Sequence, residues 1–76
     1  MVMELDEGTL TLTVNGIDRV VPVGTTLATL LATLSLDPRM IVVEHNHTIL
    51  QNRDSFGTVS LADGDTLELV HFVGGG

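Results

Sequence analysis

Hydrophobic and polar residues alternate through residues 9–14, which read Thr-Leu-Thr-Leu-Thr-Val. A period of two is typical of a strand with one buried face, so this segment is predicted to place its leucines and valine in the core. Asn15 and Gly16 follow at once, and both residue types accept the positive φ angles of a two-residue hairpin turn. The chain then returns over residues 17–23, where Pro22 suits an edge position. The pattern predicts an opening β-hairpin.

A helical spacing replaces this alternation after the second strand. Residues 24–26, Gly-Thr-Thr, break that strand and offer a threonine N-cap. Leucines then recur at i, i+3, i+4 and i+7, which places them on one stripe of a helix of about ten residues. Asp37-Pro38 is expected to end the helix, because proline disfavours helical geometry in the residue before it. The leucine stripe comprises Leu27, Leu30, Leu31 and Leu34.

Three further strands are predicted in the second half of the chain. Residues 40–43 form a continuous apolar run, typical of an interior strand with partial cover on both faces. A turn at Asn46 leads to a short strand over residues 47–50. An Asp-Gly-Asp turn at residues 63–65 precedes the last strand, residues 66–73.

The order of these elements predicts an α+β fold. Right-handed crossover rules place the last strand centrally, beside the first. This arrangement is a ubiquitin-like β-grasp, with a mixed sheet of four to five strands packed on one helix. Because a chain of this length buries only about 60% of its unfolded surface, residues 1–76 are expected to form a single domain. Residues 74–76, all glycine, have no side chains to pack and are expected to form a flexible tail.

Charge and composition exclude several classes of partner. Three Lys+Arg stand against 10 Asp+Glu, so the net charge of −7 argues against binding to nucleic acid or to an anionic membrane surface. The chain has no cysteine, so any sulfur or thiol chemistry must come from a partner. The N-terminus lacks the basic start and apolar run of a secretory signal, and no apolar stretch approaches a membrane span. We therefore expect a cytoplasmic protein.

Histidines, aspartates and arginines are the polar groups that could carry chemistry within the body of the domain. His45, His47 and His71 could bind zinc, but no cysteine or second ligand pair shows metal-like spacing, so structural histidines and no metal site are expected. Asp63 and Asp65 could resemble paired catalytic carboxylates, yet they flank a glycine and are better explained by turn chemistry. The three arginines, Arg19, Arg39 and Arg53, are expected to be solvated rather than functional.

The last strand carries a candidate partner-binding surface. If its leucines at 67 and 69 lie in the core, alternation directs Glu68, Val70 and Phe72 to the open face of the sheet. Exposed Val70 and Phe72 would form an apolar docking patch, with Glu68 and Glu44 as its acidic rim. The alternative is that Phe72 packs internally near the end of the sheet.

The C-terminus is the strongest functional candidate. The strand passes without a polar spacer into Gly74, Gly75 and Gly76, which form the end of the chain. A frayed end is one interpretation. However, glycines lack a Cβ, so Gly74 and Gly75 could thread a narrow channel and deliver the carboxylate of Gly76 to an active site in another protein.

These residues resemble a known family. Residues 62–76, in which an acidic-Gly-Asp turn leads into an apolar strand and terminal glycines, are similar to the C-terminal signature of the ThiS sulfur carriers of thiamine biosynthesis. Residues 42–46 followed by Ile49 resemble the family's central strand and turn, and residues 14–16 resemble its opening hairpin. The resemblance extends from about residue 9 onward, and the FVGGG end favours ThiS within the wider ThiS/MoaD group.

The resemblance implies a protein cosubstrate that is not itself an enzyme and binds no cofactor. A ThiF-like adenylating enzyme with ATP and magnesium would convert the Gly76 carboxylate into an acyl adenylate. A persulfide, supplied indirectly by a cysteine desulfurase, would then lead to a Gly76 thiocarboxylate. Thiazole synthase would take the sulfur for the thiazole of thiamine. The carrier itself is expected to be a monomer.

Two alternatives remain open on the sequence. One is a MoaD-like carrier that serves molybdopterin synthesis. The other is a ubiquitin-like modifier or interaction module whose glycine end is conjugated to an amine or has no chemical role. Because the chain has no lysine, side chains of this protein cannot support chain building, but attachment to other proteins stays open.

Overall fold

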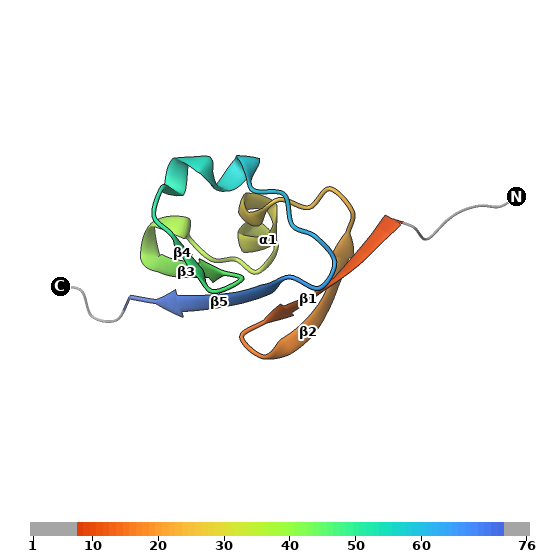
Figure 1. Ribbon diagram of the computed structural model, residues 1–76. Coiled ribbons are helices and arrows are strands. Elements are labelled where there is room, and N and C mark those ends of the chain that lie inside the picture. Colours follow the sequence, from red (N-terminus) through yellow and green to blue (C-terminus); the bar gives the residue numbers. More distant parts are fainter. Residues whose placement is uncertain (1–7, 73–76) are drawn as a thin grey trace, which may run out of the picture.

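The computed structural model describes residues 8–72 of the chain (Figure 1). The predictions for Val73 and for Gly74, Gly75 and Gly76 lie outside the described residues. In chain order the elements are β1 (Thr9–Val14), β2 (Ile17–Pro22), α1 (Leu27–Thr33), the 3₁₀ turn η2 (Pro38–Met40), β3 (Ile41–His45), β4 (Thr48–Leu50), the 3₁₀ helix η3 (Arg53–Thr58) and β5 (Thr66–His71). No helix among them is long and apolar enough to cross a membrane.

The five strands form one mixed sheet in the order β2-β1-β5-β3-β4. β1 and β5 are parallel neighbours at the centre, and the other three pairings are antiparallel. Figure 1 shows α1 and the 3₁₀ helix η3 on one side of this sheet. The predicted β-grasp and the central position of the last strand are therefore confirmed.

Two tight turns set the hairpins. Asn15 and Gly16 have φ angles of 50° and 82°, as a type I′ turn between β1 and β2 requires. The turn between β3 and β4 uses Asn46 and His47 at φ angles of 49° and 71°, although neither residue is glycine. Pro22 lies in the edge strand β2, as predicted. Its missing N–H therefore removes no hydrogen bond from the interior of the sheet.

The core lies between the sheet and the helical layer. All of its members are aliphatic except one phenylalanine, and each leaves at most 9% of its surface exposed. The leucine stripe of α1 packs there, as predicted, with Leu34 partly buried against it. The buried set is Leu12, Val14, Leu27, Leu30, Leu31, Ile41, Val43, Phe56, Leu61, Leu67 and Leu69.

The helix is shorter than the predicted ten residues, and the prediction that Asp37-Pro38 ends it is wrong. The Thr26 side chain caps the N-terminus by accepting a hydrogen bond from the Thr29 N–H, which confirms the predicted threonine N-cap. At the other end Ser35 takes a left-handed φ of 60°, and the Ser35 and Leu36 N–H groups bond the carbonyls of Ala32 and Leu31. This is a Schellman ending, which satisfies the last helical carbonyls without glycine. Asp37-Pro38 instead begins η2.

Candidate functional site

The open face of the sheet is divided between two surfaces. On the β1–β2 side it carries threonines, Val20 and Asp18, whereas on the β5–β3–β4 side it carries several hydrophobic residues beside a facing pair of glutamates. Along β5, Leu67 and Leu69 are buried, while Val70 and Phe72 are 57% and 47% exposed. Their predicted exposure is confirmed, and the alternative that Phe72 packs internally is wrong. Their role in partner binding stays a prediction.

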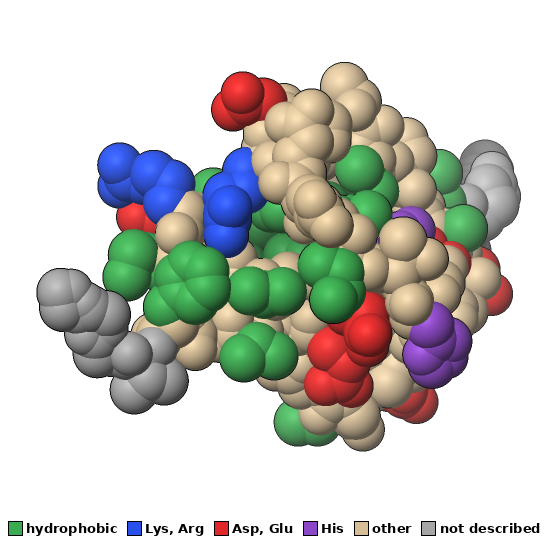
Figure 2. Space-filling model, turned by 60° about the vertical axis from the view of Figure 1, so that its left-hand side comes forward, with side chains coloured by type: hydrophobic (Ala, Val, Ile, Leu, Met, Phe, Trp, Pro, Cys, Tyr) green, Lys and Arg blue, Asp and Glu red, His purple; other side chains and the backbone are tan. Residues whose placement is uncertain are grey.

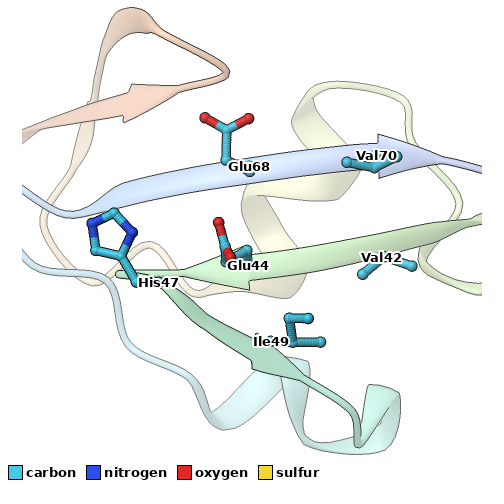
Figure 3. A pocket seen from close by; sticks show the side chains of 6 residues that line it. All are labelled: Val42, Glu44, His47, Ile49, Glu68 and Val70. Atoms are coloured by element: carbon cyan, nitrogen blue, oxygen red, sulfur yellow. The ribbon is translucent and has the colours of Figure 1, made fainter.

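A shallow depression lies on the second of these surfaces. It has a volume of about 490 Å³, and three strands and the β3–β4 turn contribute to its lining. Figure 3 shows the aliphatic side chains of β3, β4 and β5 at one end and the carboxylates and His47 at the other. Figure 2 shows hydrophobic side chains as a band on this side of the molecule, next to acidic ones. The lining residues are Val42, Glu44, His47, Ile49, Glu68 and Val70.

Glu44 and Glu68 are directly opposite each other on β3 and β5. Like charges in such a cross-strand pair are destabilising. Within residues 8–72 neither carboxylate forms an ion pair with a basic side chain. The depression therefore combines exposed apolar surface with negative charge that the described part of the chain does not neutralise.

The three histidines do not come together. The Asn46-His47 turn separates His45 from His47, and His71 lies near the other end of β5. His45 is mostly buried, and its Nε2 lies 2.8 Å from Oδ2 of Asp65. Within residues 8–72 no cluster of three groups suited to a metal ion is present.

The aspartates near the start of β5 hold the chain in place. Asp63 accepts a hydrogen bond from the Thr11 N–H at 2.7 Å, and Gly64 between them has the φ of 88° that a turn requires. Asp65 accepts from the Asn46 side-chain amide and the Ala62 N–H. Partial burial alone would raise the pKa of Asp65, but the hydrogen bonds from Asn46, His45 and Ala62 outweigh it and lower that pKa. The turn interpretation of both aspartates is confirmed.

Two asparagine side chains pair with the backbone of β5, a role that the sequence analysis missed. Oδ1 of Asn46 accepts from the Thr66 N–H at 2.9 Å. Asn15 bonds both backbone groups of Leu69, accepting from the N–H at 2.7 Å and donating to the carbonyl at 3.2 Å. Its amide thus continues the pairing of β1 with β5 for one residue after β1 has turned away. Only the turn chemistry of these asparagines could be seen in the sequence.

Arg53 is exposed, as predicted, but its guanidinium also makes contacts that the sequence did not indicate. From the start of η3 its Nε donates to the Pro38 carbonyl at 2.9 Å and its Nη2 to the Ile41 carbonyl at 3.1 Å. The guanidinium carbon also lies 5.7 Å from the centre of the Phe72 ring, within the range of a cation–π contact. Arg39 forms an exposed ion pair with Asp37.

Comparison with known proteins places the chain in a family. The sequence model of the ThiS family matches residues 12–76. The chain is 43% identical over 53 residues to the thiazole synthase of Magnetococcus marinus. This match covers 70% of this chain but only 16% of that protein. It is 41% identical over 51 residues to the sulfur carrier protein ThiS of Bacillus subtilis, covering 67% of this chain and 76% of the relative.

A solved structure agrees with this assignment. The crystal structure of the thiamine biosynthesis protein ThiS from Geobacter metallireducens matches with a TM-score of 0.74 and 33% identity. The match covers 88% of this chain and all of the other. Sequence and fold are therefore shared over most of the domain, including β5 and the turns that fix its start. The chain belongs to the ThiS family.

Proposed function

We propose that this protein is a sulfur carrier for thiamine biosynthesis, and that its reactive group is the C-terminal carboxylate of Gly76. The observation that carries the proposal is the extent of the family match, which runs through the whole of β5 and the glycines to residue 76. The name of the Bacillus subtilis relative supports the same function.

The proposed chemistry takes place in partner enzymes. A carboxylate oxygen of Gly76 attacks the α-phosphorus of ATP in a ThiF-like adenylating enzyme that uses magnesium, and pyrophosphate leaves. A persulfide sulfur, which a cysteine desulfurase supplies indirectly, attacks the acyl carbon, and AMP leaves. A thiol then reduces the resulting acyl disulfide, which frees the Gly76 thiocarboxylate. The carrier contributes no catalytic group to these steps.

Glycine suits this role for a steric reason. Without Cβ atoms, Gly74 and Gly75 let the backbone pass through a channel too narrow for side chains. The carboxylate of Gly76 can therefore reach a buried active site while the folded body stays outside. The same end can serve the enzyme that loads it and the enzyme that takes the sulfur.

We assign partner docking to Glu68, Val70 and Phe72, with Glu44 on the opposite strand. Val70 and Phe72 are exposed hydrophobic residues on the strand that leads to the glycines. A partner that covers them would remove apolar area from water, and its basic groups would compensate the facing carboxylates. Thiazole synthase is the proposed acceptor, since a protein of that name contains a segment similar to this chain.

Intact-mass measurement tests the proposal directly. The protein is incubated with a ThiF-like enzyme, ATP, magnesium, a cysteine desulfurase, cysteine and a thiol reductant. We expect the mass increase that corresponds to replacement of one oxygen by sulfur, and deletion of Gly76 should abolish it while the far-UV spectrum is unchanged. No mass change with enzymes that load the Bacillus subtilis relative would refute the proposal, and stable adducts to other proteins would indicate a modifier.

A further inference from the structure

Arg53 fills a gap in the pairing of β3. β4 has only three residues and pairs with β3 from His45 to Val43, so it ends before Ile41. The carbonyl of Ile41 on that edge would lack a strand partner, and Nη2 of Arg53 bonds it. Nε of the same guanidinium bonds the Pro38 carbonyl in η2. Two backbone acceptors thus fix the plane of the guanidinium, which a single flexible contact would not achieve.

The fixed guanidinium lies next to the Phe72 ring, directly after the end of β5. Along β5, alternate residues direct their backbone groups to β3, and within residues 8–72 the last of these bonds joins the Phe72 N–H to the Met40 carbonyl at 2.8 Å. His71 directs its groups to the other side, where β1 has already ended. Within residues 8–72 those groups have no backbone partner. Phe72 is therefore held from the β3 side, and Arg53 supplies its side-chain contact there.

We infer that Arg53 is a positioning residue for the reactive end of the chain. It contacts the ring of Phe72 and bonds the carbonyls on either side of Met40, whose own carbonyl accepts from the Phe72 N–H. Because Phe72 precedes Val73 and the three glycines, Arg53 thereby sets the point from which Gly76 must reach a partner's active site. The expected effect of Arg53 on sulfur loading rests on the proposed function. The contact between Arg53 and Phe72 is present in the carrier alone.

The mechanism is a reduction of conformational freedom before the chemical step. An unfixed Phe72 would let the chain leave the sheet in many directions, of which few bring the carboxylate to the reacting phosphorus. Fixing the last strand residue raises the fraction of bound carriers with productive geometry, which affects the rate of the bound complex more than its formation. Lysine could keep the charge over the ring but could not bond two carbonyls in one plane.

The test compares Arg53→Met with Arg53→Lys and Arg39→Met. Arg39→Met is the matched control, because Arg39 is an exposed arginine whose described partner is Asp37 rather than Phe72. In steady-state loading by the ThiF-like enzyme, we expect Arg53→Met to lower kcat about fivefold to tenfold with less than about twofold change in KM for the carrier. Arg53→Lys should recover part of the loss, and Arg39→Met should match the wild type.

Hydrogen exchange gives a second readout that needs no enzyme. In Arg53→Met the Phe72 amide should exchange about tenfold faster, while the Leu67 amide stays within about twofold of the wild type. Unchanged exchange at Phe72, or wild-type kcat in Arg53→Met, overturns the inference. A general loss of stability would instead accelerate both amides and also overturns it.

A double-mutant cycle covers the case in which Arg53→Met does not fold. Phe72→Leu removes the ring, and its effect on kcat/KM should be non-additive with that of Arg53→Lys. Additive effects refute the coupling. If even the wild type is not loaded, the proposed function fails, whereas the exchange rates and the same cycle in unfolding free energy still decide whether Arg53 positions Phe72.

Discussion

The two ends of β5 are held in different ways. At its start, Asp65 and Leu67 accept hydrogen bonds from the N–H groups of Thr13 and Asn15 on one side. On the other side, Asn46 bonds both Asp65 and Thr66. At its end, the Phe72 N–H bonds the Met40 carbonyl, and Arg53 lies within cation–π distance of the Phe72 ring. Within residues 8–72, β1 therefore pairs only with the start of β5, and the end stays open on that side to the partner that we propose. The proposed carrier function would use both properties in one strand.

The largest expected effect comes from removing the hydrogen bonds that hold the start of β5. Asn46→Ala deletes the bonds to Thr66 and Asp65 and places alanine at a φ of 49°, so we expect a loss of about 2–3 kcal/mol in the free energy of unfolding. Urea denaturation measures it. Asn46→Gly is the control, since glycine accepts the φ but makes no bonds. If the glycine variant matched the wild type, the strain and not the hydrogen bonds would account for the loss.

Asn15 tests the middle of the strand. Asn15→Gly keeps the turn but removes both bonds to Leu69, which should lower the free energy of unfolding by about 1–2 kcal/mol. The Leu69 amide should then exchange faster with solvent than the Glu68 amide does. Equal protection of the two amides in the variant would show that Asn15 does not extend the β1–β5 pairing.

A substitution at the exposed end should affect loading and leave stability unchanged. Val70→Ser should raise KM for the ThiF-like enzyme about fivefold, because a valine that becomes buried in the complex contributes about 1 kcal/mol. Its effect on unfolding should stay within about 0.5 kcal/mol, since Val70 is exposed. Val20→Ser is the matched control, because Val20 is also an exposed valine, on the β1–β2 side of the same face. Equal KM values for the two variants would contradict docking on the β5 side.

Acid should lower the stability that Asp65 contributes at the start of β5. The pKa of Asp65 is lower in the folded protein than its ordinary value of 3.8, so its contribution to stability is complete above that value and is lost as pH falls through the folded pKa. Asp65→Asn should be less stable at neutral pH and should lose less stability than the wild type on acidification. Urea midpoints between neutral pH and pH values below 3.8 measure the difference. Parallel curves for the two proteins would assign the acid sensitivity to other groups.

The smallest expected effect concerns the facing carboxylates. Glu68→Gln removes a like-charge pair with Glu44 and should stabilise the fold by about 0.2–0.5 kcal/mol at low salt. The same change should weaken loading, and the difference from the wild type should shrink as salt screens the partner's charge. If loading by the variant equalled that of the wild type at low salt, the acidic rim would have no part in docking.

Most of the fold could be predicted from local patterns. Period-two alternation identified the first strand, a continuous apolar run identified β3, and helical spacing identified α1. The Asn15-Gly16 turn predicted that β1 and β2 pair as a hairpin. The end of α1 could not be predicted, because Ser35 takes a conformation that its type rarely adopts. Such an ending depends on how Leu36 packs against the core, and no local pattern contains that information.

The candidate site was predicted in part. Alternation along β5 was enough to predict that Val70 and Phe72 are exposed, because a side-chain period of two applies to any strand. The roles of Asn15 and Arg53 were missed for one reason. Each bonds backbone atoms far away in sequence, 54 residues for Asn15 and 12 to 15 for Arg53, so neither local spacing nor residue type indicates the partner.

The sequence by itself determined the elements, the exposed face of β5 and the glycine end, since these follow from side-chain periodicity and from what glycine permits. Tertiary structure alone decided how β5 is held, because strands of unequal length leave backbone groups that only side chains from other elements can satisfy. Asn15 and Asn46 bond the backbone of β5, and Arg53 bonds the Ile41 carbonyl of β3 next to Phe72. These groups come within reach of one another only in the folded chain.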